Sequence, residues 1–331
     1  MNPILKVNDI SKHYHQPKQS FFDKAIVTKA VHKVSFELKE GEAFGLVGES
    51  GCGKSTTGQM LLQLIKQTSG TIFYKGEDVS KFSRQQMKAW RKQVQIVFQD
   101  PFSSLNPIKT IEWILEEPLI IHRIGNKQTR KQKILDTLAD VGLDESYLTH
   151  YPHELSGGQR QRIAIASAII LDPEFIVIDE GVSALDVSVQ AQILNLLKSI
   201  QQKYRLTYLF ISHDLNIVQY FCDRIAIMYF GEIVELGTAS EIGNDPKHPY
   251  TQALFSAIPS LEDDREIIVL SGDVPSHANP PSGCAFHTRC KFAEARCRTE
   301  KPKLNSIGEH RTVSCHLYEK EEGRNAIRRT V

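Results

Sequence analysis

One short stretch limits what this chain can fold into more than any other: "GESGCGKST", residues 48–56. It fits the pattern G-x-x-x-x-G-K-[ST], whose fixed positions are Gly48, Gly53, Lys54 and Ser55. Glycines let the backbone wrap closely around phosphate groups with N–H groups pointing inward, and the lysine adds a full positive charge. An apolar run precedes the stretch and a helical pattern follows it, so we expect a strand, a phosphate-binding loop and a helix.

Fully apolar runs occur at 44–48, 94–98, 175–179 and 207–212. Such runs are typical of strands that are buried on both faces of a parallel sheet. Helical patterns lie between them, and the longest, 187–204, carries its apolar residues at helical spacing. The alternation of strand and helix patterns predicts a doubly wound α/β domain.

Three parts of the chain depart from this alternation. Two patterns typical of strands, 4–10 and 34–38, precede the phosphate-binding loop. From about 100 to 168 helical patterns dominate, which predicts a helical subdomain inserted into the α/β core. Toward the C-terminus the sequence becomes rich in Pro, Gly and Ser, so we expect a domain over 1–258 and an extension over 259–331.

Two further motifs place acidic or polar groups at the ends of predicted elements. "FIVIDE", residues 175–180, is an apolar strand that ends in Asp179 and Glu180. The first carboxylate can hold Mg²⁺ through water, and the second can polarise an attacking water as general base. "LSGGQ", residues 155–159, opens a predicted helix whose N-terminus favours anions. The acidic pair is weak alone, but the phosphate-binding loop makes it a strong sign of nucleotide hydrolysis.

With these motifs in this order, the sequence resembles the ATP-binding-cassette (ABC) ATPases, whose signature is LSGGQ. The resemblance implies an α/β P-loop NTPase fold: an ABC ATPase core with an inserted helical subdomain, N-terminal antiparallel strands and a small C-terminal Cys-containing extension. It also implies ATP and Mg²⁺ as ligands, with two subunits that sandwich two ATP molecules. The implied ATP-binding residues are Gly48, Glu49, Ser50, Gly51, Cys52, Gly53, Lys54, Ser55, Thr56, Tyr14, Ser156, Gly157, Gly158, Gln159 and Asp186.

The same resemblance implies catalytic and metal-binding roles. Glu180 is the implied base, His213 the switch histidine that contacts the γ-phosphate, and Gln99 the Q-loop glutamine that senses Mg²⁺ and water. The implied Mg²⁺ ligands are Ser55, Gln99 and Asp179. These side chains follow the C-terminal ends of apolar strands, where open parallel sheets bind ligands.

Tyr14 and Gly181 lead to separate expectations. Tyr14 is the candidate for stacking on adenine, and the alternative is a tyrosine that is simply packed near a strand end. Gly181 follows Glu180 where the family usually has proline. Proline contributes no chemical group to the reaction, so its replacement should not remove activity. Glycine makes the backbone more flexible, so we expect it to change only how Glu180 is held.

Three stretches narrow the resemblance: "FQDPFSSLNPIKTI" (98–111), "HPYTQALFSAIPS" (248–260) and the cysteine-containing 272–297. Together they resemble the ATPase subunits, of the F type, of oligopeptide and dipeptide ABC importers and of related nickel importers. The resemblance implies a second ABC ATPase subunit in a heterodimer, two membrane permeases, an indirect link to an extracytoplasmic solute-binding protein, and a place on the cytoplasmic face of the membrane. Trp113 is a candidate for the permease contact, with a place in the subdomain core as the alternative.

Bulk properties fit this class. The start of the chain lacks the features of a signal peptide, and the apolar run 163–171 is too short to span a membrane. Lys and Arg number 40 against 39 Asp and Glu, so we expect no nucleic acid partner. A soluble ABC ATPase acting on ribosomes usually has tandem cassettes, whereas this chain has one loop and one signature. An ATP-holding module without hydrolysis conflicts with intact Lys54, Asp179, Glu180 and His213.

Four of the six cysteines lie in the extension: Cys284, Cys290, Cys297 and Cys315. A reducing compartment argues against disulfides. Four thiolates in a short segment suit one metal centre, either a [4Fe–4S] cluster or Zn²⁺, and unpaired packing cysteines are the alternative. The spacing does not identify the metal, and the resemblance favours iron–sulfur. His287 and His316 are further candidates as zinc ligands, and a solvent-exposed histidine without a metal is the alternative for each.

Overall fold

The computed structural model describes residues 3–15, 27–100, 104–181, 185–258, 268–270, 272, 275–276 and 280–319. Its centre is a sheet of eight strands in the order β11-β12-β10-β9-β3-β8-β7-β6. The five core strands are β3 (Ala43–Val47), β6 (Val94–Val97), β7 (Phe175–Asp179), β8 (Thr207–Ser212) and β9 (Arg224–Tyr229). They pair in parallel with one another. The predicted strands at 44–48, 94–98, 175–179 and 207–212 are therefore confirmed.

The parallel strands are buried on both faces, as their unbroken apolar sequences predict. Along β7, Ile176 and Ile178 belong to one apolar core, while Phe175 and Val177 belong to another. Successive side chains of a strand point to opposite faces, so one strand supplies both cores. The first core lies against helices that include α7 (Val187–Tyr204) and α8 (Leu215–Phe221), and the second lies under a smaller sheet.

The smaller sheet is antiparallel, with the order β2-β1-β4-β5. Its strands are β1 (Leu5–His15), β2 (Val27–Leu38), β4 (Ser69–Tyr74) and β5 (Glu77–Asp78). The N-terminal antiparallel strands are thus confirmed, and β1 runs beyond the predicted strand end so that it includes Tyr14. After β5 come a short 3₁₀ turn (Val79–Lys81) and α2 (Arg84–Gln93), which sequence patterns did not single out.

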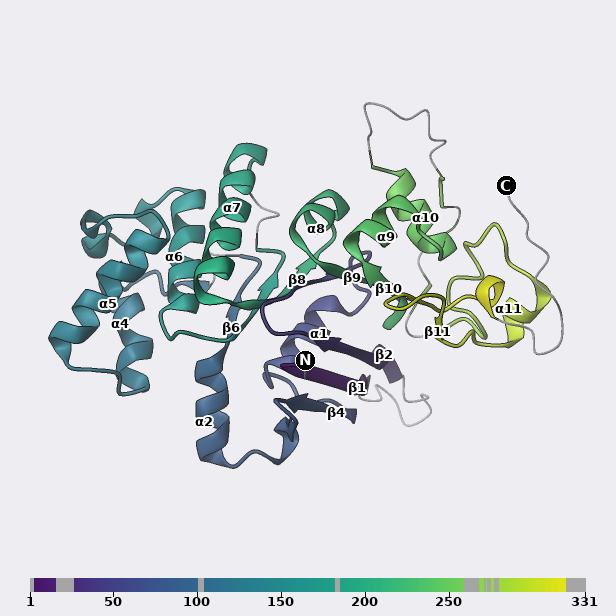
Figure 1. The fold of residues 1–331 in the computed structure, drawn as a ribbon, viewed down its shortest axis with the longest axis horizontal. Coiled ribbons are helices and arrows are strands. Elements are labelled where there is room, and N and C mark those ends of the chain that lie inside the picture. The colour runs from purple at the N-terminus through teal and green to yellow at the C-terminus, as the bar shows by residue number, and fades with distance from the viewer. Residues whose placement is uncertain are drawn as a thin grey trace, which may run out of the picture.

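Helices form the region between β6 and β7 in its described residues. They are α4 (Ile111–Ile121), α5 (Lys127–Asp140) and α6 (Gly157–Ile169), with 3₁₀ turns at Glu145–Thr149 and Pro152–Glu154. Figure 1 shows these helices gathered at one end of an elongated molecule. The inserted helical subdomain is therefore present. Trp113, on the first turn of α4, is 37% exposed, and the Lys109 ammonium lies 4.6 Å from its ring centroid.

The extension lies at the opposite end of the molecule, beyond α9 (Ala239–Asn244) and α10 (Pro249–Ser256) (Figure 1). It contains α11 (Ala295–Thr299), β11 (Asn305–Ser306), β12 (Thr312–Val313) and a 3₁₀ turn at His316–Tyr318. β12 pairs antiparallel with β10 (Glu232–Thr238), and β10 pairs antiparallel with β9. The extension therefore continues the central sheet instead of forming a separate layer.

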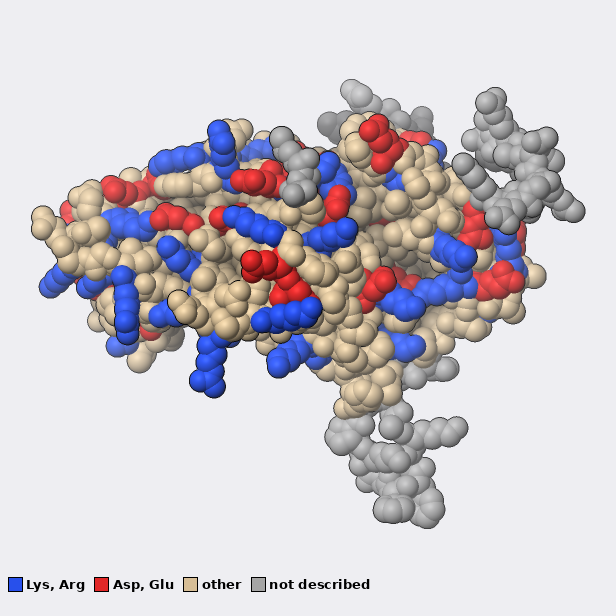
Figure 2. Space-filling model, turned by 60° about the horizontal axis from the view of Figure 1, so that its bottom comes forward, with Lys and Arg blue, Asp and Glu red and all other residues tan. Residues whose placement is uncertain are grey.

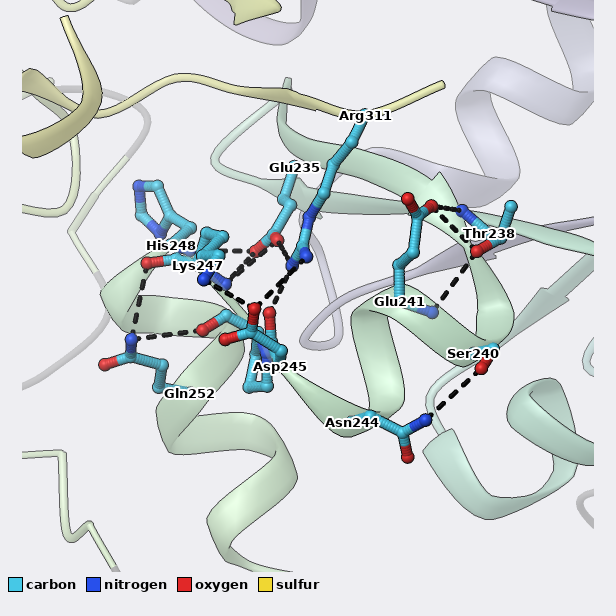
Figure 3. A network of polar contacts seen from close by, with 11 residues as sticks. Glu235, Thr238, Ser240, Glu241, Asn244, Asp245, Lys247, His248, Gln252 and Arg311 are labelled. Atoms are coloured by element: carbon cyan, nitrogen blue, oxygen red, sulfur yellow. Dashed lines mark hydrogen bonds and ion pairs between the residues drawn. The ribbon is translucent and has the colours of Figure 1, made fainter. Parts of the chain in front are cut away.

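A buried polar network fixes this junction (Figure 3). The Arg311 guanidinium donates to Glu235 Oε1 at 2.6 Å, and these side chains are 7% and 0% exposed. Glu235 also accepts hydrogen bonds from the backbone N–H groups of Lys247 and His248. The buried carboxylate thus has a cation and two N–H donors, as a buried charge needs.

No helix in the part of the chain that the structure describes is long and apolar enough to span a membrane. On the face drawn in Figure 2, the coloured basic and acidic side chains are interspersed over the surface. This mixture agrees with the near-balanced charge of the sequence.

Candidate active site

The loop 48–56 joins β3 to α1 (Lys54–Leu61), as the sequence predicts. Two of its glycines have no room for a side chain. A Cβ on Gly48 would lie 2.1 Å from the Met228 carbonyl oxygen, and one on Gly53 would lie 2.3 Å from that of Ala30. Gly53 also has φ of +105°, which L-residues with a Cβ rarely adopt. The glycines are therefore required by the packing of the loop against β2 and β9.

Lys54 and Ser55 open α1 with their polar groups turned toward the loop. The Lys54 ammonium is buried and donates to the carbonyl oxygens of Gly48 at 2.7 Å and Glu49 at 3.0 Å. The Ser55 hydroxyl donates to Asp179 Oδ1 at 2.9 Å. Burial raises the pKa of Asp179, and the Ser55 hydrogen bond only partly offsets this effect. A hydroxyl beside a buried carboxylate at the helix start provides the oxygen ligands that Mg²⁺ prefers.

Gln99, Glu180 and His213 meet at the carboxyl edge of the sheet. The Gln99 amide donates to Glu180 Oε2 at 2.8 Å, and His213 Nδ1 lies 3.2 Å from Glu180 Oε1. The three residues follow β6, β7 and β8, which are neighbours in the sheet. Both oxygens of one carboxylate are thus contacted from the two flanking strands, so the structure brings the three predicted catalytic residues together.

The backbone at Glu180 is unusual. Glu180 has φ of +49°, in the left-handed region, and its N–H donates to the Ile211 carbonyl oxygen at 2.9 Å. Such a conformation costs energy in a non-glycine residue and is common at functional positions. Gly181 is buried, and a Cβ there would lie 3.0 Å from Ile178 Cγ2. The expectation that Gly181 changes how Glu180 is held stays a prediction.

The signature residues lie on a different part of the molecule, at the start of α6. Ser156 is the N-cap, its hydroxyl accepts from the Gln159 N–H at 3.3 Å, and Gln159 Oε1 accepts from the Ser156 N–H at 2.8 Å. Gly158 packs against α7, because a Cβ there would lie 2.8 Å from Val189 Cγ1, and Gly157 precedes it on the first turn. This arrangement is a well-capped helix N-terminus on the surface of the helical subdomain.

Asp186 and Tyr14 complete the predicted set. Asp186 is the N-cap of α7 and accepts from the Val189 N–H at 2.9 Å, while 182–184 before it lie outside the described residues. Tyr14 is 43% exposed near the end of β1, and the Lys12 ammonium lies 5.2 Å from its ring centroid. The tyrosine is thus open to solvent, as a stacking platform must be. The rest of the loop, Ser50, Gly51, Cys52 and Thr56, lies in the turn and first helical residues.

Comparison with known proteins places this site in a family. The ABC transporter family matches residues 31–183, and the C-terminal region of oligopeptide/dipeptide transporters matches residues 234–297. The chain is 49% identical over 320 residues to the oligopeptide transport ATP-binding protein AppF of Bacillus subtilis, covering 95% of this chain and 97% of that one. It belongs to the oligopeptide and dipeptide transport ATP-binding proteins of the ABC transporter family. It is thus an ABC-type ATPase, as the motifs predict.

A further relative and two solved structures support the family assignment. The dipeptide transport ATP-binding protein DppF of Escherichia coli is 48% identical over 322 residues, with 97% of this chain and 96% of that one covered. Among solved structures, cbiO1 from Clostridium perfringens, part of the ABC transporter complex cbiONQ, has a TM-score of 0.63 at 26% identity. It covers 74% of this chain and 92% of that one. The dimeric cassette MJ0796 bound to ADP and Pi has a TM-score of 0.62 at 29% identity, covering 71% and 98%.

The four cysteines of the extension line a single pocket in this ABC ATPase, together with Phe286 and other residues. Burial, reinforced by the neighbouring thiols, raises the pKa of Cys284 to about 11 and that of Cys315 to about 12. All six cysteines are free thiols. Among the described residues, no three His, Cys, Asp or Glu side chains are grouped so as to hold one metal ion.

The histidines beside these cysteines have other partners. His316 is buried, with Nδ1 2.7 Å from Glu319 Oε2 and Nε2 3.0 Å from the Glu300 carbonyl oxygen. His287 Nδ1 lies 2.8 Å from the Cys284 carbonyl oxygen. Both nitrogens of His316 are thus engaged in the fold, which disfavours this residue as a zinc ligand.

One contact of the active site was not predicted. The Glu49 N–H donates to the Tyr250 hydroxyl at 3.0 Å, and the Glu49 carboxylate pairs with Arg289 at 2.9 Å. Tyr250 lies in the stretch 248–260, whose pattern pointed only to a family. Nothing in the spacing of these residues indicates that they meet the phosphate-binding loop.

Proposed function

We propose that this ATPase energises the uptake of oligopeptides or dipeptides by an ABC importer. The observation that carries the proposal is the meeting of Gln99, Glu180 and His213 at the sheet edge beside the loop that holds Lys54. The names of relatives that match almost the whole chain support the peptide cargo. An importer of nickel or of a metal-chelating compound is the alternative within the family.

Hydrolysis follows from the contacts of the site. The N–H groups of the loop and the Lys54 ammonium bind the β- and γ-phosphates. Ser55, Asp179 and Gln99 are suited to hold Mg²⁺, which neutralises charge on the phosphate oxygens. Glu180 accepts a proton from the attacking water, and Gln99 and His213 fix the direction of its carboxylate. His213 is 55% exposed and therefore free to contact the γ-phosphate.

A second subunit completes the site in this proposal. Ser156, Gly157, Gly158 and Gln159 form the N-terminus of α6, in the helical subdomain, and a helix N-terminus favours anions. Facing the γ-phosphate of a partner subunit would give this terminus a ligand. Asp186 is the N-cap of α7, the helix against which Gly158 packs. The dimeric form of the cassette MJ0796 supports this arrangement. We propose a heterodimer with another ABC ATPase, in which Tyr14 stacks on adenine.

The importer needs further components. Two membrane permeases bind the ATPase pair, and a solute-binding protein delivers cargo from the other side of the membrane. The half-exposed Trp113 on α4 is a candidate for the permease contact. The chain then lies on the cytoplasmic face of the membrane. The proposed domains are 1–258, which holds nucleotide, and 259–331, which carries four of the six cysteines.

For the cysteine pocket we propose an iron–sulfur cluster, with Zn²⁺ as the alternative. One zinc ion needs four ligand atoms about 2.3 Å away, which brings the sulfurs close to one another. Cys284, Cys290, Cys297 and Cys315 line one pocket. A [4Fe–4S] cluster spans its own width between four thiolates. These four residues would hold it, and its contribution is structural.

Transport assays test the function. A strain that lacks this chain is supplied with the wild type or with Lys54→Ala, and uptake of labelled di- and oligopeptides and of nickel is measured. We expect the wild type, and not the variant, to restore peptide uptake. Restored nickel uptake without peptide uptake contradicts the peptide cargo, and restored peptide uptake by the variant contradicts the nucleotide site.

Metal analysis tests the pocket. The protein is purified without oxygen, iron, sulfide and zinc are quantified, and the visible spectrum is recorded. We expect equal amounts of iron and sulfide and a brown protein. One equivalent of zinc with no sulfide favours Zn²⁺, and a colourless, metal-free, fully active protein rules out a metal centre.

A further inference from the structure

The cysteine-rich extension contacts the phosphate-binding loop through one ion pair. Arg289 Nη1 donates to Glu49 Oε2 at 2.9 Å, and Nη2 donates to Glu49 Oε1 at 3.2 Å. The two residues are 240 positions apart in the sequence. Two parallel hydrogen bonds between a guanidinium and a carboxylate fix both orientation and distance. The Arg289 side chain is 8% exposed and that of Glu49 is 25% exposed, so solvent screens this pair less than a surface pair.

The backbone of Glu49 is held from the same side. Its N–H donates to the hydroxyl of Tyr250, which is fully buried. The Tyr250 ring lies 5.4 Å from the ring of Phe286, which is 2% exposed. Phe286 is three residues before Arg289, so the segment 284–290 supports both contacts. Side chain and backbone of one loop residue are thereby fixed by groups outside the nucleotide-binding motifs.

The charge of Glu49 explains why such support is needed. Glu49 is the second residue of a loop that binds a triphosphate, and Lys54 donates to its carbonyl oxygen. A carboxylate at this place repels phosphate oxygens, because both are negative and lie in a partly desolvated region. The Arg289 guanidinium cancels that charge and turns the carboxylate toward the extension.

We propose that Arg289 is a positioning residue of the nucleotide site, which neutralises Glu49 and keeps the phosphate-binding loop in the shape that accepts ATP. The proposal rests on the proposed function, since it assumes that the loop 48–56 binds ATP. Arg289 touches neither the phosphates nor the reacting atoms. Its effect therefore falls on ATP affinity and KM, with little change in kcat.

The test is a double-mutant cycle in the full-length chain. The Kd for Mg·ATP, the KM and kcat of hydrolysis, and the melting temperature are measured for wild type, Arg289→Ala, Glu49→Gln and the double variant. Arg298→Ala, an exposed arginine of the same extension, is the matched control. We expect Arg289→Ala to raise Kd and KM about tenfold, because an uncompensated carboxylate on the phosphate-binding loop repels the phosphates. We expect kcat to change by less than about twofold.

Glu49→Gln distinguishes an effect of charge on ATP binding from an effect of lost structure. In the Arg289→Ala background, Glu49→Gln removes the uncompensated charge and is expected to restore most of the affinity. Arg289→Lys, which keeps the charge but not the bidentate geometry, should give an intermediate Kd. Glu49 belongs to the loop through its backbone, which Glu49→Gln keeps, so this variant alone should lower the Kd for ATP because a repelling charge is lost. This measurement holds even where Arg289→Ala fails to fold.

Three results overturn the proposal. An Arg289→Ala Kd within about twofold of the wild type removes the positioning role. If Arg289→Ala raises the Kd and adding Glu49→Gln does not lower it again, the arginine only anchors the extension. Weakened ATP binding by Glu49→Gln alone contradicts charge compensation. If the wild type itself shows no saturable ATP binding, the nucleotide site fails first and this inference with it.

Discussion

The carboxyl edge of the central sheet and the cysteine pocket both collect side chains from distant parts of the sequence, but by different means. At the sheet edge, Gln99, Glu180 and His213 are brought together because parallel strands end at the same side. In the pocket, irregular segments around a short helix bring Cys284 and Cys315 together. Regular structure positions the first group, whereas packing against neighbouring elements positions the second.

The two regions also differ in how they treat polar groups. At the sheet edge, both oxygens of Glu180 are contacted by partly exposed polar groups, which leaves the site accessible. In the pocket, burial raises the pKa of Cys290, as it does those of Cys284 and Cys315. Exposed polar groups suit a site that exchanges ligands, whereas the pocket thiols would have to lose their protons to bind a metal.

Ion pairs join the extension to the rest of the molecule, and two of them differ in burial. Arg311 binds Glu235 in the central sheet, and Arg289 binds Glu49 in the phosphate-binding loop. The first pair is almost fully buried and anchors the extension, whereas the second is partly open and lies beside the nucleotide site. We therefore expect loss of the Arg311–Glu235 pair to lower stability and loss of the Arg289–Glu49 pair to weaken ATP affinity.

The largest effect is expected at the sheet edge. His213→Ala should lower ATP turnover roughly 10³-fold, because Glu180 loses one of the two contacts that aim it and the γ-phosphate loses a contact. The Kd for ATP should change little, since the Lys54 contacts remain. Steady-state phosphate release and nucleotide titration measure the two effects. A variant with normal turnover contradicts the predicted role of His213.

The anchor of the extension should control stability. Arg311→Met leaves Glu235 as a buried carboxylate without its cation, which costs about 3 kcal/mol in the free energy of unfolding. Lys301→Met breaks a more exposed pair with Glu232 and should cost less than about 1 kcal/mol. Denaturant unfolding of both variants measures the difference. Equal losses would show that burial does not distinguish the two pairs.

A buried histidine at the junction should make stability depend on pH. His248 is fully buried, and burial lowers its pKa from 6.5 to about 3. The unfolded chain therefore binds a proton that the folded chain does not, and stability falls as the pH falls from 6.5 toward 3. The slope from this residue approaches about 1.4 kcal/mol per pH unit.

His248→Asn tests this prediction and keeps the cap of α10, because asparagine can also accept from the Tyr250 N–H. Unfolding of both proteins at several pH values between 4 and 7.5 gives the difference, and we expect a shallower pH dependence in the variant. The same slope in both proteins would mean that another group carries it.

The smallest expected effect concerns adenine. Tyr14→Ala should raise the Kd for ATP roughly fivefold through loss of stacking. Tyr220→Ala is the matched control, since that tyrosine is also exposed and also has a lysine ammonium near its ring, Lys198 at 3.9 Å. Equal affinities of the two variants would remove Tyr14 from the nucleotide site and favour the alternative of simple packing.

The residues at the carboxyl edge of the sheet could be predicted from the sequence, because motif spacing and the geometry of parallel strands together determine their positions. The strands before Gln99, Glu180 and His213 are each short and fully apolar, so their carboxyl ends could be placed in advance. The strand β12 could not be placed, because two residues between turns carry no periodicity. The Arg289–Glu49 pair could not be predicted from the sequence either, because a contact between residues 240 positions apart depends on the packing of Tyr250 and Phe286.

The central claim is that Glu180 activates water at a site that binds ATP without it, and the variant Glu180→Gln tests this most directly. Bound nucleotide and released phosphate are measured after incubation with Mg·ATP, with Arg298→Ala as control. We expect the variant to retain ATP with unchanged affinity while phosphate release is nearly abolished. Unchanged turnover in Glu180→Gln would contradict the assignment of the base.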